Sequence, residues 1–233
     1  MDNNKTEKNI SKYIKSFAPS RYKKKNNDEL CWELFLGQYK IDENCDFESI
    51  SKNREISIEI GSGCGDFLIH QAKEYPEKLF IGCDAYKGGV LETIKKSKDD
   101  NLKNIKLFNG DGRLLIDRAI ELNFKFKNIV VLFADPWPKN KHSRRRIINS
   151  EFLFSLSKVL SKNSKIVIAS DDPSYQNHIM ELLSANEIKS VFEIKTANQN
   201  NIDSIIEKYR TTKYHLKAIQ SGRSSIFWSL SLL

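Results

Sequence analysis

Short runs of β-branched and other apolar residues alternate with longer periodic stretches along most of the chain. Seven such runs predict strands, at residues 56–60, 79–83, 105–108, 129–133, 165–169, 191–194 and 225–232. Between them, helical spacing predicts helices over 66–74, 88–98, 113–120, 151–160 and 174–185, the last with Met180 and Leu183 on its buried side. This alternation predicts an α/β fold with a doubly wound, mostly parallel sheet and right-handed crossovers.

The first predicted strand runs directly into a loop that contains Gly61, Gly63 and Gly65. Ligands of open α/β sheets bind at the carboxyl ends of the strands, where glycines let a ligand approach bare backbone. The spacing lacks the third glycine of the dinucleotide fingerprint, and Asp66 at the helix start is a poor neighbour for a pyrophosphate. The loop therefore favours a cofactor without phosphate, and a nicotinamide oxidoreductase is the weakest alternative.

Acidic residues stand at or near the ends of the first three predicted strands. Glu59 precedes the glycines, and Asp84 follows the second strand, where an acid accepts the hydroxyl protons of a ribose. The alternative for Asp84 is a cap on the next helix. Asp111 follows the third strand, where it is suited to an adenine amino group. Together the three acids favour an adenosine-containing, phosphate-free cofactor, which is S-adenosylmethionine.

The fourth predicted strand leads into a stiff loop with an aromatic residue and many positive charges. Prolines 136 and 138 flank Trp137, which we expect to stack on a flat base while Asp135 lies beside the reactive end of the cofactor. The alternative is a packed surface Trp and a solvated basic turn. Five basic residues within eight positions are suited to phosphate groups: Lys139, Lys141, Arg144, Arg145 and Arg146.

The net charge of +8 is concentrated at the N-terminus of the 233-residue chain. Residues 1–25 hold eight basic and two acidic residues, whereas the other 208 hold 30 and 28. We therefore divide the chain into a basic arm, residues 1–28, and a domain, residues 29–233. Such an arm favours a polyanionic partner, the alternative being a solvated terminus that keeps the chain soluble.

Other classes of protein are excluded by what the chain lacks. The longest apolar run has six residues, 129–134, against the roughly 20 that a membrane-spanning helix needs. The first 25 residues contain no apolar stretch of the kind found in secretory signals. The four cysteines form no CxxC pair, so we expect no metal site and reduced thiols in the cytoplasm.

Three stretches of the sequence resemble the bacterial tRNA (guanine-N7)-methyltransferases. They are E-I-G-x-G-x-G at 59–65, F-A-D-P-W-P-K at 133–139 and H-S-R-R-R-I at 142–147. Ala169-Ser170-Asp171 and Thr211-Thr212-Lys213-Tyr214 also fit, so the resemblance covers about residues 55 to 232. It implies the class I methyltransferase fold, a seven-stranded sheet with an antiparallel last strand. It also implies methyl transfer from S-adenosylmethionine to N7 of guanine 46 in the variable loop of tRNA.

The resemblance also implies roles for single residues. Glu59, Asp84, Asp111 and Asp135 match the cofactor acids, and Asp135 is our candidate catalytic residue. His215 stands where the family usually has Glu, which implies an altered RNA contact or an acid role taken by Glu207 or Asp203. With the aromatic and basic loop residues added, the expected tRNA contacts are Lys139, Asp171, Thr212, Lys213, Tyr214, His215, Trp137, Arg144, Arg145 and Arg146.

The partner and the oligomeric state leave alternatives open. A methyltransferase for a protein or small molecule is opposed by the basic arm. An RNA-binding protein that has lost catalysis is favoured by His215 and opposed by the four acids. We expect the arm, with Lys23, Lys24 and Lys25, to bind tRNA. Its removal should then weaken tRNA binding and change the catalytic rate little. The opposite result would place the arm in the catalytic site. A monomer and a homodimer are both compatible with the sequence.

Overall fold

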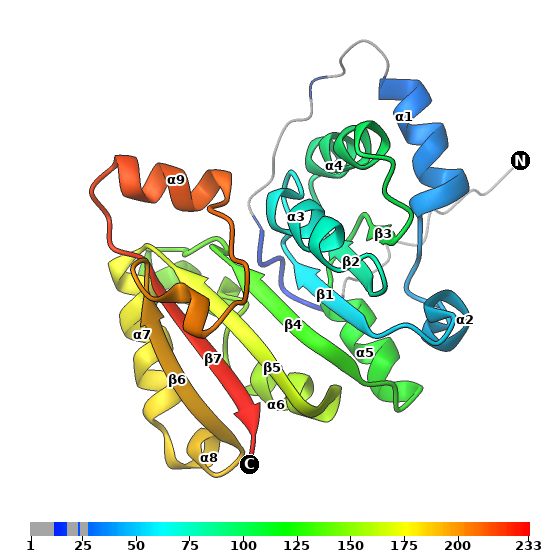
Figure 1. The fold of residues 1–233 in the computed structure, drawn as a ribbon. Helices are drawn as coiled ribbons and strands as arrows, with labels where there is room; N and C mark the ends of the chain where they lie inside the picture. Colours follow the sequence, from blue (N-terminus) through cyan, green and yellow to red (C-terminus); the bar gives the residue numbers. More distant parts are fainter. Residues whose placement is uncertain (1–11, 18–22, 24–27) are drawn as a thin grey trace, which may run out of the picture.

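One seven-stranded sheet, in the order β3-β2-β1-β4-β5-β7-β6, organises the fold (Figure 1). The structure, a computed structural model, describes residues 12–17, 23 and 28–233. Lys24 and Lys25 of the predicted arm lie outside these residues. β7 is antiparallel to β5 and β6, and the remaining pairings are parallel. The strands are β1 (Ile56–Ile60), β2 (Leu79–Cys83), β3 (Ile105–Phe108), β4 (Phe126–Leu132), β5 (Leu160–Ser170), β6 (Phe192–Asn198) and β7 (Ile226–Leu232).

Helices cover both faces of this sheet (Figure 1). On one face lie α2 (Phe47–Ser51), α5 (Arg113–Glu121), α6 (Ser150–Lys158), α7 (Pro173–Ser184) and α8 (Asn186–Lys189). On the other lie α1 (Asp28–Leu34), the π-helical turn Phe35–Tyr39, α3 (Asp66–Glu74), α4 (Lys87–Asp99) and the 3₁₀ turn Ile202–Ser204. A second 3₁₀ turn, η2 (Asn140–Arg145), follows β4, and α9 (Lys213–Gln220) precedes β7.

The alternation of side chains along β1 shows how the layers form. Ile56, Ile58 and Ile60 point to the face that α5, α6 and α7 cover, where they join the largest apolar cluster. Ser57 and Glu59 point to the opposite face, and all five residues are buried. A strand buried on both faces between helices is typical of parallel sheets. The predicted fold class is therefore confirmed.

The observed elements differ from the predicted ones in several places. α9 covers a stretch that the sequence did not predict as helical, and the helical turns before β1 were also missed. β5 begins five residues earlier than predicted, because Leu160 already pairs with Phe126 across a bulge. The expectation for Met180 was wrong: it is 43% exposed, whereas Leu183 is buried.

The chain reverses its direction of winding between β1 and β4. β2 and β3 extend the sheet on one side of β1, and β4 and β5 extend it on the other. The crossovers therefore diverge at the carboxyl ends of β1 and β4, and open α/β sheets bind their ligands at such a switch point. The loops that follow these two strands are the ones that carry Gly61–Gly65 and Asp135.

Candidate active site

The glycine-rich loop after β1 needs left-handed backbone at three positions. Gly61, Gly63 and Gly65 have φ of +79°, +54° and +72°, a region in which side chains are disfavoured. The Gly61 N–H donates to the Cys83 carbonyl at the end of β2, which folds the loop onto the neighbouring strand. At Gly65 a Cβ would lie 2.5 Å from Oγ1 of Thr93 in α4. The loop thereby presents bare backbone at the carboxyl edge of the sheet.

Glu59 is a buried acid with an unsatisfied oxygen. It is 5% exposed, and its Oε2 atom has no hydrogen-bond partner. Burial raises the pKa of this carboxyl well above its ordinary value, and the charges of Asp84 and Asp66 add to the effect. A cation or a hydrogen-bond donor bound at Oε2 would stabilise the ionised carboxylate.

Asp84, after β2, shapes the glycine loop. Its Oδ2 accepts the Gly63 N–H and its Oδ1 accepts the Tyr86 N–H, both at 2.7 Å. The N-cap position of α4 is Tyr86, so Asp84 does not serve as the cap that was its alternative role. Burial raises the pKa of Asp84, and the charge of Asp135 contributes in the same direction. Each carboxylate oxygen keeps a second lone pair for a ligand hydroxyl.

Asp111, after β3, is already paired with an arginine that sequence reasoning did not single out. The Arg113 Nε and Nη2 atoms donate to Oδ1 and Oδ2 at 3.0 and 2.6 Å. The two side chains are 9% and 14% exposed, so the pair is largely shielded from water. A ligand amino group at Asp111 would share the carboxylate with Arg113.

The loop after β4 holds Asp135 between two residues with unusual backbone. Phe133 and Trp137 have φ of +53° and +44°, and left-handed backbone costs a non-glycine residue roughly 1–2 kcal/mol. Phe133 stacks on His215 at 5.4 Å between ring centroids, and the Trp137 indole N–H donates to the Ser16 carbonyl at 2.8 Å. These contacts support the two strained residues, while Asp135 between them is exposed.

The basic residues beyond this loop have different environments. Lys139 and Arg144 are exposed. The Arg145 guanidinium lies 4.7 Å from the Trp137 ring centroid. Arg146 is 8% exposed and donates to the Pro136 carbonyl at 2.9 Å and to Ser174 Oγ at 2.7 Å. Arg146 therefore stabilises the loop after β4 from its buried side, whereas Lys139 and Arg144 are exposed to solvent.

The N-terminus of α9 lies against the glycine loop. Asp66 Oδ2 accepts the Lys213 N–H at 2.9 Å, and Asp66 Oδ1 forms an ion pair with Lys96. Burial acts to raise the pKa of Asp66, but the Lys96 ammonium and the Lys213 N–H outweigh it and lower that pKa. A Cβ on Gly63 would lie 3.4 Å from Cε2 of Tyr214. Asp66, which the sequence suggested only as an argument against pyrophosphate, thus connects α9 to the cofactor loop.

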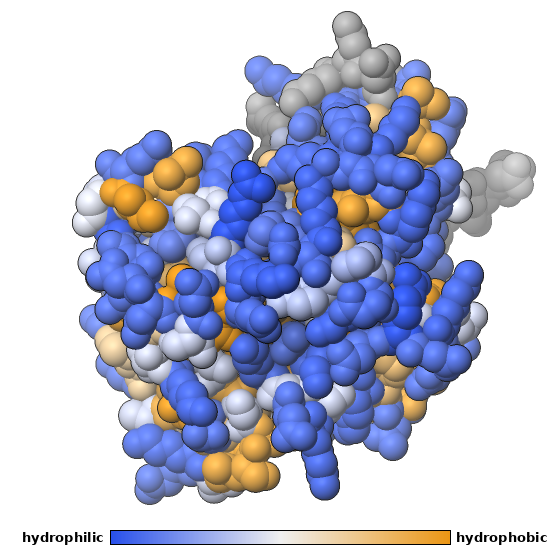
Figure 2. Space-filling view, viewed as in Figure 1, coloured by the Kyte–Doolittle hydropathy of each residue, from blue (hydrophilic) through white to orange (hydrophobic). Residues whose placement is uncertain are grey.

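The remaining predicted contacts on α9 are partly buried. Thr212 is the N-cap, is 7% exposed, and accepts the His215 N–H at 3.2 Å. His215 is 2% exposed and packs among Phe133, Phe227 and Tyr209 rather than at the surface. Lys213 and Tyr214 are exposed. Figure 2 shows hydrophobic surface over α9, where Leu216 and Ile219 are 47% and 43% exposed.

Asp171 follows β5 and is held by an arginine close to β7. Arg223 Nε donates to its Oδ2 at 2.8 Å, and the Asp171 side chain is 21% exposed. Burial lowers the pKa of the nearby His215, and the charge of Asp171 partly opposes this. The acid therefore lies at the same edge of the sheet as the His215 cluster.

Glu59 lines two cavities. A crevice of about 20 Å³ lies between the glycine loop and α9, and its lining includes Gly61, Phe133 and Tyr214. A larger cavity of about 110 Å³ lies on the α3 face and extends toward Lys78. Glu59 and Phe67 line both. We place the candidate site at the crevice, because it lies at the carboxyl ends of β1 and β4.

Metal-binding clusters and membrane-spanning helices are both absent from the residues that the structure describes. No group of three or more His, Cys, Asp or Glu side chains is placed to hold a metal ion there. No helix in that part of the chain is long and apolar enough to cross a membrane.

Comparison with known proteins gives matches over most of the chain. A family described as "Putative methyltransferase" matches residues 53–227. A curated tRNA (guanine-N(7)-)-methyltransferase of Wolbachia pipientis wMel is 33% identical over 231 residues, covering 96% of this chain and 94% of that protein. A curated bifunctional methyltransferase of Rickettsia felis is 37% identical over 174 residues, 75% of this chain. The chain spans about a third of that relative, since the match covers 32% of its length.

A solved structure supports the fold independently of sequence. An antibiotic-related methyltransferase aligns with a TM-score of 0.52 over 91% of this chain and 97% of its own, at 13% identity. Because the identity is so low, this likeness concerns the arrangement of strands and helices only.

Proposed function

The chain belongs to the tRNA (guanine-N7)-methyltransferase family, and from this premise we propose that it methylates N7 of guanine 46 in the variable loop of tRNA. The methyl donor in this proposal is S-adenosylmethionine. The observation that carries the proposal is the exposed Asp135 at the end of β4, beside the glycine loop of the adjacent β1. Exposed Lys139 and Arg144 follow on the same segment, where tRNA phosphates would bind.

The residues present fit an S-adenosylmethionine molecule. Glu59 offers an unpartnered buried oxygen to a positively charged group. A Cβ on Gly61 would meet no atom within 4 Å, so the backbone there is open to a ligand. Asp84 would accept the ribose hydroxyls, and Asp111 would accept the adenine amino group beside Arg113. When bound, this cofactor supplies an electrophilic methyl group on a sulfonium.

Methyl transfer to guanine N7 does not require a general acid or base from the protein. Guanine N7 carries a free lone pair at neutral pH, so no proton has to leave before the new N–C bond forms. Methylation at N7 would leave a positive charge on the guanine ring. The Asp135 carboxylate would stabilise that charge, and preorganised groups of this kind contribute roughly 3–4 kcal/mol.

The protein's second task is to hold the base in line with the methyl group and to exclude water. Tyr214 beside the glycine loop and Trp137 after β4 would supply flat surfaces for the base. Asp171 would accept hydrogen bonds from guanine N1–H and the exocyclic amine, which adenine does not offer in this pattern. Kinetics of Asp171→Asn on guanine- and adenine-bearing transcripts tests this role, and unchanged discrimination contradicts it.

The proposed function is tested with labelled S-adenosylmethionine and an unmodified tRNA transcript. We expect one 7-methylguanosine per tRNA, at position 46, by nucleoside mapping. A transcript with adenine at position 46 is the substrate control and is expected to remain unmodified. Asp135→Asn, which keeps the side-chain shape, is expected to lower kcat by about 10²-fold or more.

The other outcomes point to other functions. Binding of S-adenosylhomocysteine without any modified nucleoside would refute the tRNA proposal and leave a methyltransferase for another substrate. Binding of tRNA without binding of either cofactor form would indicate an RNA-binding protein that has lost catalysis. Methylation of a guanine elsewhere in the transcript would retain the reaction and refute position 46.

A further inference from the structure

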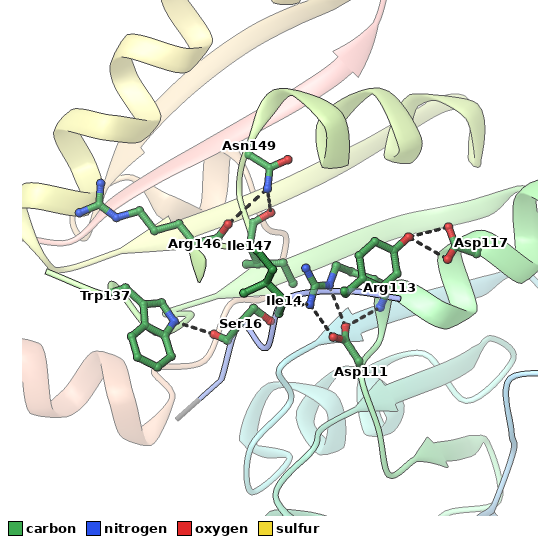
Figure 3. A network of polar contacts seen from close by, with 10 residues as sticks. Ile14, Ser16, Asp111, Arg113, Asp117, Trp137, Arg146, Ile147 and Asn149 are labelled. Carbon is green, nitrogen blue, oxygen red and sulfur yellow. Dashed lines mark hydrogen bonds and ion pairs between the residues drawn. The ribbon is translucent and has the colours of Figure 1, made fainter. Parts of the chain in front are cut away.

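Residues 12–17 lie along the carboxyl edge of the sheet, from α5 to the loop after β4 (Figure 3). At one end the Tyr13 hydroxyl donates a hydrogen bond to the Asp117 carboxylate at 2.7 Å. At the other end the Ser16 carbonyl accepts the Trp137 indole N–H. The segment thus joins the two loops that carry Asp111 and Asp135. We refer to residues 12–17 as the strap.

Arg113 is the point at which the strap meets the cofactor acid. Its Nη2 donates to the Ile14 carbonyl at 2.7 Å as well as to Asp111. The Tyr13 ring lies 4.3 Å from the guanidinium carbon. Two of the groups that fix the orientation of Arg113 therefore come from the strap. Since Arg113 binds both oxygens of Asp111, the strap also fixes the direction in which that carboxylate points.

Tyr13 anchors this end of the strap. Burial, together with the hydrogen bond to Asp117, raises the pKa of its phenol, so the hydroxyl remains a donor throughout the physiological range. Its ring and its hydroxyl act on different partners, Arg113 and Asp117. Tyr13→Phe and Tyr13→Ala therefore separate the hydrogen bond from the ring contact.

Trp137 is the point at which the strap meets the substrate side. Its left-handed backbone, two residues after Asp135, needs support from surrounding structure. The Ser16 carbonyl holds the indole N–H, and Arg145 and His142 contact the ring. Without the strap, the ring would keep its contacts to η2 but lose the hydrogen bond that fixes its rotation.

We propose that Tyr13, Ile14 and Ser16 of the strap are positioning residues of the active site, which set Asp111 through Arg113 and the Asp135 loop through Trp137. This inference rests on the proposed function and extends it. From the charge of the N-terminal region alone, we expected a contribution to tRNA binding and little change in turnover. The contacts of the strap predict the opposite for Tyr13, Ile14 and Ser16: an effect on cofactor binding and turnover, with little effect on tRNA affinity.

Three full-length variants test the strap, with a matched control from the same segment. Tyr13→Ala removes both contacts of the Tyr13 side chain, Tyr13→Phe removes only its hydrogen bond, and Trp137→Phe keeps a flat ring but lacks the donor to Ser16. The control is Lys15→Ala, because Lys15 is exposed and removing its charge mimics a purely electrostatic role. Circular dichroism and urea unfolding check that each variant folds.

Two readouts distinguish positioning from charge. By calorimetry on the chain alone, we expect S-adenosylhomocysteine to bind about tenfold more weakly to Tyr13→Ala and about threefold more weakly to Tyr13→Phe, of the order expected for such contacts. In methyl-transfer assays we expect Tyr13→Ala and Trp137→Phe to lower kcat about five- to tenfold, with tRNA Kd within twofold. Lys15→Ala is expected to weaken tRNA binding slightly and to keep kcat.

The proposal is overturned if the Tyr13 and Trp137 variants behave like Lys15→Ala, with altered tRNA affinity and unchanged kcat and cofactor affinity. If Tyr13→Ala does not fold, Trp137→Phe and Tyr13→Phe decide the question by the same criteria. Because the calorimetric experiment uses no tRNA, it remains informative if the chain methylates a different substrate. Failure of the strap and failure of the proposed function are therefore distinguishable.

Discussion

The glycines of the loop after β1 allow backbone strain to be separated from crowding. Gly61 and Gly65 both have positive φ, but a Cβ on Gly61 would meet no atom within 4 Å. A Cβ on Gly65 would lie 2.5 Å from Oγ1 and 2.6 Å from Cγ2 of Thr93. Thr93 is fully buried and its hydroxyl donates to the Gly89 carbonyl, so it has little freedom to move. Gly61→Ala therefore introduces strain alone, and Gly65→Ala introduces strain and overlap.

The expected losses in the free energy of unfolding follow from these contacts. Left-handed backbone costs alanine about 1–2 kcal/mol at either position. Overlap in a packed core adds about 1–3 kcal/mol for Gly65→Ala, for a total of about 2–5 kcal/mol. The loss of cofactor affinity is expected to be larger for Gly61→Ala than for Gly65→Ala. Gly61 lines the crevice, so a methyl group there meets the ligand, whereas the Gly65 substitution acts mainly on the fold.

Urea unfolding followed by circular dichroism measures the stability of the two variants, and calorimetry with S-adenosylhomocysteine measures their cofactor affinity. Thr93→Ala provides the internal test, because it removes the atoms that a Cβ on Gly65 would overlap. The double variant Gly65→Ala/Thr93→Ala is expected to be more stable than the sum of the single losses predicts. Equal stability losses for Gly61→Ala and Gly65→Ala, or strict additivity with Thr93→Ala, would refute the reasoning.

Two further predictions concern the acids around the crevice. Because burial raises the pKa of Glu59 and a cationic ligand favours its carboxylate, binding of S-adenosylmethionine should release protons. The affinity for S-adenosylmethionine should then rise by up to tenfold per pH unit while Glu59 is protonated in the free chain. Calorimetry in buffers of different ionisation enthalpy counts the protons released on binding. A count of zero at every pH contradicts the prediction. Asp66→Ala should lower kcat severalfold, because α9, which carries Tyr214, loses its attachment at Lys213. Asp66→Asn, which keeps an acceptor, should fall between, and wild-type kinetics for Asp66→Ala would show that α9 needs no such attachment.

The sequence predicted the sheet well because its signals are local. β1, β2 and β3 have the predicted bounds, since each is a short apolar run between turn residues. α9 was missed although Thr212 marks its start as an N-cap, and the hydrogen bond from Lys213 to Asp66 is a distant contact that no local pattern indicates. The strap could not be predicted at all. Apart from the Tyr13 side chain, its contacts with Arg113 and Trp137 are made by the backbone carbonyls of Ile14 and Ser16, a group that every residue possesses.

The three consecutive arginines show where reasoning from residue type ends. The sequence assigned all three to tRNA phosphates, on the basis of their charge. In the structure Arg144 is exposed, Arg145 lies against Trp137, and Arg146 is buried in contact with Pro136 and Ser174. Only the first two are positioned to meet an external phosphate. Burial, which depends on the folding of η2, decides the role that charge alone leaves undetermined.

His215 is a second residue whose role is decided by burial, and this can be measured. Its ring stacks on Phe133, the strained residue two positions before Asp135, and its Nδ1 lies 2.9 Å from the Tyr209 hydroxyl. The family resemblance expects Glu here, so His215→Glu would restore the usual residue. In this chain the carboxylate would be buried among Phe133 and Phe227 with one polar partner, at a cost of roughly 2–4 kcal/mol.

We therefore expect the usual residue to be harmful in this context. Burial would raise the pKa of the new carboxyl in the folded state above its unfolded value. Stability would be retained at acid pH and lost as pH rises through the folded pKa. Urea unfolding of His215→Glu from pH 5 to 8 should show this slope, with kcat falling in parallel as Phe133 loses its support. His215→Gln, neutral and of similar size, should show no such slope. If His215→Glu matches the wild-type chain in stability and kcat across this range, then His215 is not what supports Phe133, and the position of Asp135 depends on the β4 loop and Trp137 alone.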